Sequence, residues 1–128
     1  MDLSLIYREE LMDHIKNPKN KGVLKNYTNK VLVTNTSCGD KIVVYANIKN
    51  DVIVDLKYKP SACAISVASA SMLSDQLIGL STQELDKINK DTVLGNFYNT
   101  LTPSRQKCAL LVLEAIKKLK DQIGKNKN

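Results

Sequence analysis

The stretch IVVYANIKNDVIVDLKY, residues 42–58, decides the fold of this chain. Hydrophobic residues stand at every second position of its first half, at Ile42, Val44, Ala46 and Ile48. This period is typical of a half-buried strand. The Asn50-Asp51 pair then favours a turn. After it the same period returns at Val52, Val54, Leu56 and Tyr58. The stretch therefore predicts two consecutive strands joined by a short turn.

A further strand is predicted over residues 31–36, and three strands in a row with short turns indicate an antiparallel meander. Helical spacing predicts helices over residues 3–16 and 63–80. The segment Ser81-Thr-Gln-Glu84 has the form of a capping box and predicts another helix start. Thr102 and Pro103 fit an N-cap and first helical residue, followed by a long amphipathic helix to Ile123. We expect one α+β domain over residues 1–128, a three-stranded antiparallel sheet with helices mainly on one face.

Composition limits the classes of partner. The net charge is +6, but lysine supplies nearly all of the positive charge, since Arg8 and Arg105 are the only arginines. Nucleic-acid binders usually show arginine clusters or aromatics among basic residues, so we expect no nucleic-acid partner. No stretch approaches the roughly 20 apolar residues of a membrane span. The N-terminus lacks a signal-peptide pattern, so we expect a cytoplasmic protein whose cysteines are reduced.

The chain has three cysteines, each where a predicted strand or helix begins or ends. Cys38 and Asp40 are two residues apart, so in an extended segment both side chains point to the same face. Gly39 between them tolerates unusual backbone dihedrals. Taken alone, Cys-Gly-Asp fits a simple turn between two strands better than a functional site.

Cys63 lies at a predicted helix start, where the helix dipole favours a thiolate, although a small buried residue fits equally well. Cys108 lies in the first turns of the last helix, with Arg105 three residues earlier on the same face. Taken alone, Cys108 fits a buried residue of the hydrophobic core. His14, the single histidine, is expected at the surface or its boundary rather than as a ligand. Together, three thiolates and the Asp40 carboxylate can make a soft-metal or sulfur-handling site.

Four segments in the same order make the chain resemble the iron–sulfur cluster assembly scaffolds of the IscU/SufU/NifU N-terminal type. They are DHIKNPKN (13–20), CGD (38–40), CAISVASASM (63–72) and RQKCA (105–109). The third segment is the most specific match. The resemblance implies a carrier rather than a turnover enzyme, at most a zinc-dependent sulfurtransferase.

By position, the resemblance implies that Cys38, Asp40, Cys63 and Cys108 hold a zinc ion or a [2Fe–2S] cluster. It implies that the protein accepts persulfide sulfur from a cysteine desulfurase of the SufS/IscS type. It also implies that apo iron–sulfur proteins are its downstream partners. Cys38 and Cys108 are the candidate sulfur acceptors. We further expect Arg105 to act as an electrostatic switch that alternately pairs with Asp40 and releases it.

Two branches of the family remain open. Lys107 directly before Cys108 resembles the zinc-containing SufU branch, because scaffold proteins usually have histidine there. The short spacing between Cys63 and Cys108 resembles the scaffold branch. Outside the family, the alternative is a structural zinc protein without sulfur transfer; a basic nucleic-acid-binding domain ranks below both.

Overall fold

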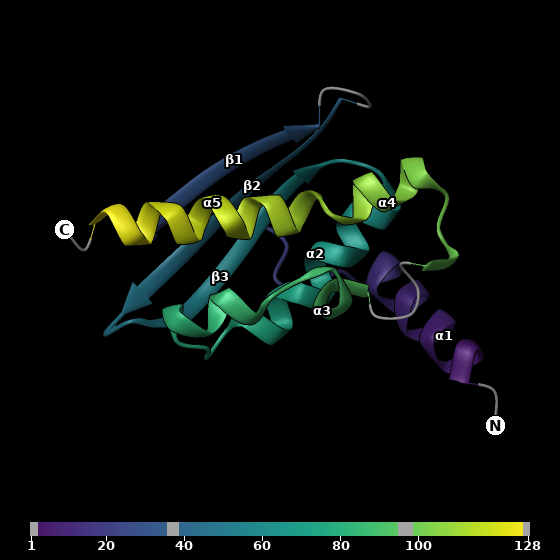
Figure 1. Ribbon diagram of the computed structural model, residues 1–128, viewed down its shortest axis with the longest axis horizontal. Coiled ribbons are helices and arrows are strands. Elements are labelled where there is room, and N and C mark those ends of the chain that lie inside the picture. The colour runs from purple at the N-terminus through teal and green to yellow at the C-terminus, as the bar shows by residue number, and fades with distance from the viewer. Residues whose placement is uncertain (1–2, 36–38, 95–98, 127–128) are drawn as a thin grey trace.

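The computed structural model describes residues 3–35, 39–94 and 99–126. The described helices and strands follow one another as α1 (Leu3–Lys16), β1 (Asn29–Asn35), β2 (Asp40–Lys49), β3 (Val52–Ser61), α2 (Ala64–Leu77), the 3-10 helix η1 (Thr82–Lys87), α3 (Lys90–Leu94), α4 (Pro103–Ala109) and α5 (Leu111–Asn126). The strands form an antiparallel sheet in the order β1-β2-β3, as the meander predicted. In Figure 1, α5 crosses the sheet, and α1 lies at the far end beside α2.

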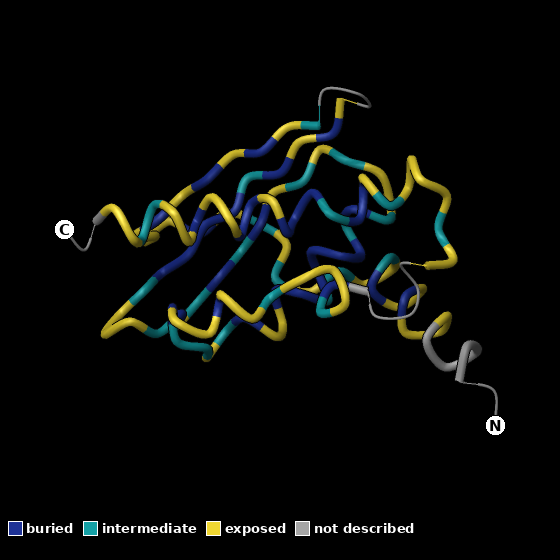
Figure 2. Tube along the Cα trace, in the orientation of Figure 1, coloured by how far each residue is buried: buried dark blue, intermediate teal, exposed yellow. Residues whose placement is uncertain are grey.

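The helices cover one face of the sheet, as expected. Buried and exposed residues alternate along β1, whereas the four consecutive β2 residues 44–47 are all buried (Figure 2). Inward-facing side chains that are almost completely buried come from β2 and β3, among them Ile42, Val44, Ile53 and Tyr58. They meet Leu73 and Leu77 of α2 and Leu119 of α5 in one hydrophobic core. On the other face Leu32 is 50% exposed.

The strand period of β3 was predicted wrongly in its first half. Val54 is 44% exposed, whereas Ile53 is fully buried. The cause is a register shift, because Asn47 pairs with Asp55 while Ile48 pairs with Ile53, which leaves Val54 as the extra residue of a β-bulge. Before the bulge Ile53 faces inward, and after it Leu56 and Tyr58 face inward.

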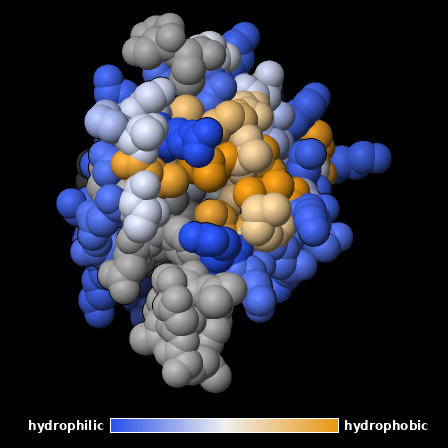
Figure 3. All heavy atoms as spheres, turned by 90° about the vertical axis from the view of Figure 1, so that its right-hand side faces the viewer, coloured by the Kyte–Doolittle hydropathy of each residue, from blue (hydrophilic) through white to orange (hydrophobic). Residues whose placement is uncertain are grey.

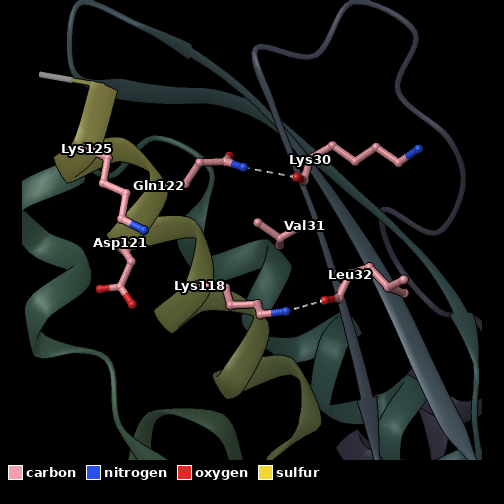
Figure 4. Close-up of a pocket in the computed structure, with 7 residues that line it drawn as sticks. All are labelled: Lys30, Val31, Leu32, Lys118, Asp121, Gln122 and Lys125. Carbon is pink, nitrogen blue, oxygen red and sulfur yellow. Dashed lines mark hydrogen bonds between the residues drawn. The ribbon is translucent and has the colours of Figure 1, made fainter.

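Both edge strands of the sheet have backbone groups bonded from outside the sheet. At the edge strand β1, Lys118 Nζ donates to the Leu32 carbonyl at 3.0 Å, and Gln122 Nε2 donates to the Lys30 carbonyl at 3.3 Å (Figure 4). A groove of about 600 Å³ runs along this edge between β1 and α5. At β3, the backbone of Gly22 donates to the Tyr58 carbonyl at 2.8 Å. These hydrogen bonds engage backbone carbonyls of the edge strands that could otherwise pair with a strand of another molecule.

The last predicted helix is two helices. A seven-residue α4 ends at Ala109, and Leu110, with φ −86° and ψ −2°, separates it from α5. Thr102 caps α4 as predicted, since its hydroxyl accepts a hydrogen bond from the Arg105 backbone at 3.4 Å. Cys108 therefore lies in the last turn of a short helix, not in the first turns of a long one. No helix of the described part is long and apolar enough to cross a membrane.

Candidate metal centre

Three of the predicted ligands come together at one end of the sheet. Asp40 is the first residue of β2, Cys63 directly precedes α2, and Cys108 lies near the end of α4. One carboxylate oxygen and the two sulfur atoms all lie within 4.8 Å of one another. Segments far apart in the sequence thus converge, because β2 and α2 begin where α4 ends.

The secondary structure explains each position. Cys63 is the N-cap of α2, with φ −69° and ψ 167°, so its sulfur lies where the first amides of the helix have no internal acceptor. Gly39, just before Asp40, has φ +74°, in the left-handed region that glycine adopts without strain. Its N–H donates to the Asn35 carbonyl at 2.8 Å and closes the turn into β2.

The three groups differ in access to solvent. Cys63 is exposed, Cys108 is 7% exposed, and the Asp40 side chain is largely covered. Of these three residues, Cys63 is therefore the most open to a reagent or partner approaching from solvent. The face at this end of the molecule carries a group of hydrophobic residues near its centre, with hydrophilic ones around it (Figure 3). Ala62 and Ile65, which flank Cys63 in sequence, are partly exposed hydrophobic residues.

The donor set fits a soft or borderline metal ion. Two ligand atoms on one tetrahedral zinc ion are about 3.3–3.8 Å apart. The present separations, all within 4.8 Å, are close to that range, and thiolate sulfur with one carboxylate oxygen is chemistry that zinc accepts. Asp40, Cys63 and Cys108 can therefore contribute three ligands to one centre.

Two other predicted site residues are not part of the observed cluster. Cys38 lies outside the described residues, so its place as a ligand stays a prediction. The Arg105 side chain is exposed, and the described residues include no ion pair between it and Asp40. Its proposed role therefore requires a state in which the guanidinium approaches the carboxylate.

The sequence reasoning missed Ser66. This residue is 2% exposed, and its hydroxyl contacts Asp40, Cys63 and the backbone of Cys108. It donates to the Cys108 carbonyl at 2.8 Å and lies 3.4 Å from Asp40 Oδ2 and 3.6 Å from Cys63 Sγ. The signal was present, because residue 66 is the third residue of a helix capped by Cys63, and N-cap and N3 side chains lie side by side.

The expected position of His14 at the surface or its boundary was wrong. Its ring is 7% exposed, and Nδ1 lies 2.7 Å from Ser71 Oγ of α2. The Ser71 hydroxyl also accepts a hydrogen bond from the Lys19 backbone at 2.8 Å. His14 is thus a buried residue that joins α1 to α2. Helical spacing alone could not show that α2 would cover this face of α1.

Comparison with known proteins identifies the family of this chain. A family model described as NifU-like N terminal domain matches residues 6–127. The chain is 34% identical to the zinc-dependent sulfurtransferase SufU of Bacillus subtilis (strain 168), over 91% of this chain and 90% of that protein. It is 29% identical to the iron-sulfur cluster assembly scaffold protein IscU 1 of Archaeoglobus fulgidus, over 94% of this chain and 79% of that protein.

Solved structures show the same fold. A putative iron-sulfur cluster assembly scaffold protein for the SUF system from Fervidobacterium islandicum AW-1 superposes with a TM-score of 0.73 at 32% identity, covering 91% of this chain and 97% of that chain. The N-terminal part of a NifU-like protein from Brucella abortus gives a TM-score of 0.79 at 20% identity, covering 96% and 97% of the two chains. Matched by the family model over nearly its whole length, this chain belongs to the NifU-like N-terminal domain family.

Proposed function

We propose that this protein is a sulfur-accepting carrier of iron–sulfur cluster assembly. It takes persulfide sulfur from a cysteine desulfurase and holds a zinc ion or a transient [2Fe–2S] cluster on Cys38, Asp40, Cys63 and Cys108. The observation that supports this most directly is the convergence of the Asp40 carboxylate with two thiols within 4.8 Å. The names of relatives, a zinc-dependent sulfurtransferase and cluster scaffolds, support the same role.

The transfer step is a thiol exchange without net oxidation. A cysteine thiolate of this protein attacks the terminal sulfur of the desulfurase persulfide. The new S–S bond forms as the old one breaks, and the electron pair of the broken bond leaves on the desulfurase cysteine as a thiolate. Cys38 and Cys108 are the candidate acceptors. Because Cys108 is 7% exposed, acceptance there requires α4 to give the donor access to its sulfur.

The ligand set suits a protein that hands its cargo on. Stable clusters are usually held by four cysteines. In a set of three cysteines and one carboxylate, the carboxylate oxygen is the weakest ligand and the easiest to displace. A zinc ion held there would favour the thiolate forms of its cysteine ligands. Lys107 before Cys108 fits the zinc form, and a cluster bound on the same residues would be cargo for apo iron–sulfur proteins.

Arg105 is proposed as the switch at the carboxylate. It lies three residues before Cys108 on α4, exposed and able to reorient. Pairing with Asp40 would withdraw the carboxylate from the metal and open a position. Arg105→Gln should then slow sulfur acceptance while zinc still binds, and Arg105→Lys should retain part of the rate. Equal transfer rates in both variants and the unchanged protein would contradict this role.

The experiment that tests the proposed function follows sulfur from a SufS-type desulfurase. The desulfurase receives labelled cysteine, and mass spectrometry detects persulfide on this protein. We expect label on Cys38 or Cys108, increased alanine release by the desulfurase, and loss of both in the matching serine variant. Bound zinc without any persulfide would instead favour a structural zinc protein.

A further inference from the structure

We infer that Ser66 is a positioning residue of the proposed metal centre, an inference that rests on the proposed function. Its hydroxyl contacts all three described ligand residues. Those residues belong to β2, the start of α2 and α4. Ser66 therefore connects separate elements at the point where the ligand atoms must be held at fixed distances from one another.

The shortest contact fixes α4. The Ser66 hydroxyl donates to the Cys108 carbonyl at 2.8 Å. The Leu110 N–H at the C-cap of α4 also points to this carbonyl. Because Ser66 bonds the same carbonyl from α2, it sets the distance between the backbone of Cys108 and the turn that carries Cys63.

The longer contacts reach the ligand atoms themselves. Asp40 Oδ2 lies 3.4 Å and Cys63 Sγ lies 3.6 Å from the Ser66 oxygen. A hydroxyl has only one hydrogen, which cannot serve the carbonyl and the carboxylate at once. With the hydrogen on the Cys108 carbonyl, the carboxylate oxygen remains open to a cation. With the hydrogen on Asp40, the carboxylate is held back from it.

The same helix provides a matched control. Ser69 is one turn further along α2 and is fully buried like Ser66. Its hydroxyl donates only to the Ile65 carbonyl of its own helix, at 2.9 Å, and it is not part of the cluster. Ser66→Ala and Ser69→Ala therefore remove the same atom from the same buried helix, but only the first touches the ligands.

Zinc affinity, measured by competition with a chromophoric chelator, is the first readout. We expect Ser66→Ala to weaken zinc binding by about 10- to 100-fold, the usual effect of losing a group that orients a ligand, and Ser69→Ala to change it less than about threefold. Cobalt(II) gives a second readout, because its visible bands report ligand geometry. The bands should shift in Ser66→Ala and not in Ser69→Ala.

A coupling test separates positioning from general loss of stability. In an Asp40→Ala background, Ser66→Ala should weaken zinc binding by a smaller factor than in the unchanged protein, because part of its effect passes through the carboxylate. A purely structural role would give the same factor in both backgrounds. Circular dichroism of the metal-free variants checks that each one is folded.

A measurement on the unchanged protein keeps the inference testable if Ser66→Ala does not fold. The ¹³Cβ resonance of Ser66 should move in step with zinc binding, while that of Ser69 should not. Zinc binding with no shift at Ser66, or equal zinc affinity and cobalt bands in Ser66→Ala and the unchanged protein, would overturn the inference. If the unchanged protein binds no zinc or cobalt and forms no persulfide, the proposed function itself fails instead.

Discussion

His14 Nδ1 lies 2.7 Å from the Ser71 hydroxyl, and this contact joins α1 to α2. Ser71 Oγ also accepts the Lys19 N–H at 2.8 Å, which holds the chain that leaves α1. α2 carries Cys63 at its N-terminus, so α1 supports the helix that positions a proposed ligand. Breaking a buried polar contact of this kind lowers the stability of the fold, because the remaining buried partner has lost a hydrogen bond.

Replacing His14 by alanine should destabilise the fold. The buried Ser71 hydroxyl loses a partner, and we expect the free energy of unfolding to fall by about 1–3 kcal/mol. Met12 on the same helix is 44% exposed, and Met12→Ala should change the free energy of unfolding by less than about 0.5 kcal/mol. Urea unfolding of both variants measures the difference. Equal effects would mean that the His14–Ser71 contact contributes nothing.

Tyr58 should make stability fall at alkaline pH. Burial raises the pKa of its hydroxyl above the ordinary 10.0, and the neighbouring Ser71 hydroxyl acts in the opposite direction. The Tyr58 oxygen is buried and makes no hydrogen bond to any described residue. Because the folded state holds the proton more tightly than the unfolded state, this stabilisation is complete below pH 10 and is lost as pH rises towards the raised pKa.

The Tyr58→Phe variant isolates this effect, since every other tyrosine and lysine is unchanged. Between pH 10 and the raised pKa, the unchanged protein should lose up to about 1.4 kcal/mol per pH unit relative to the variant. Below pH 9 the difference should be constant. Urea unfolding at several pH values from 8 to 11 gives both curves, and curves that stay parallel throughout would exclude the proposed pH dependence.

The two described thiols should react at different rates. Cys63 is exposed, whereas Cys108 is buried, so in folded metal-free protein iodoacetamide should modify Cys63 about tenfold faster or more. Zinc should protect both if they share one ion. Mass spectrometry of peptides after short exposures measures each rate. Protection of only one thiol by zinc would argue against a shared centre.

Gly39 should be required for its backbone conformation alone. It has φ +74°, and a Cβ built there meets nothing within 4 Å. Gly39→Ala should therefore reduce the free energy of unfolding by about 1–2 kcal/mol through strain and should weaken zinc binding by displacing Asp40. Gly124 in α5 also has open space around it, but no left-handed φ. Gly124→Ala should stabilise by up to about 1 kcal/mol and leave zinc binding unchanged.

The sequence predicted most of the fold because its signals were local. The strand over residues 42–48, the Asn50-Asp51 turn and the Thr102 cap depend on neighbouring residues, and all three appear in the structure. The expected half-buried alternation within that strand does not, because residues 44–47 are all buried. The bulge at Val54 and the break at Leu110 were missed. Each depends on how the segment fits against other elements of the packed domain, which no periodicity reveals.

The candidate site could be predicted as a set of ligands but not as a built centre. Asp40, Cys63 and Cys108 do converge, as their positions at element ends suggested. Ser66 was missed because its role depends on a carbonyl 42 residues away. That Asp40, Cys63 and Cys108 bind a metal stays a prediction, as do the roles of Cys38 and Arg105. The position of Ser66 three residues after Cys63 indicated that these two lie side by side, but no local pattern indicated the contact with Cys108.

Metal content tests the central claim most directly. Zinc and iron should be measured in anaerobically purified protein, alongside Cys63→Ser, Cys108→Ser and Asp40→Ala. Asp75→Asn is the control, since that carboxylate is 49% exposed on α2 and pairs with Lys19 instead. We predict close to one zinc ion per chain in the unchanged protein and the control, with loss in both cysteine variants and weaker retention in Asp40→Ala. Metal content unaffected by all three changes would contradict a shared centre.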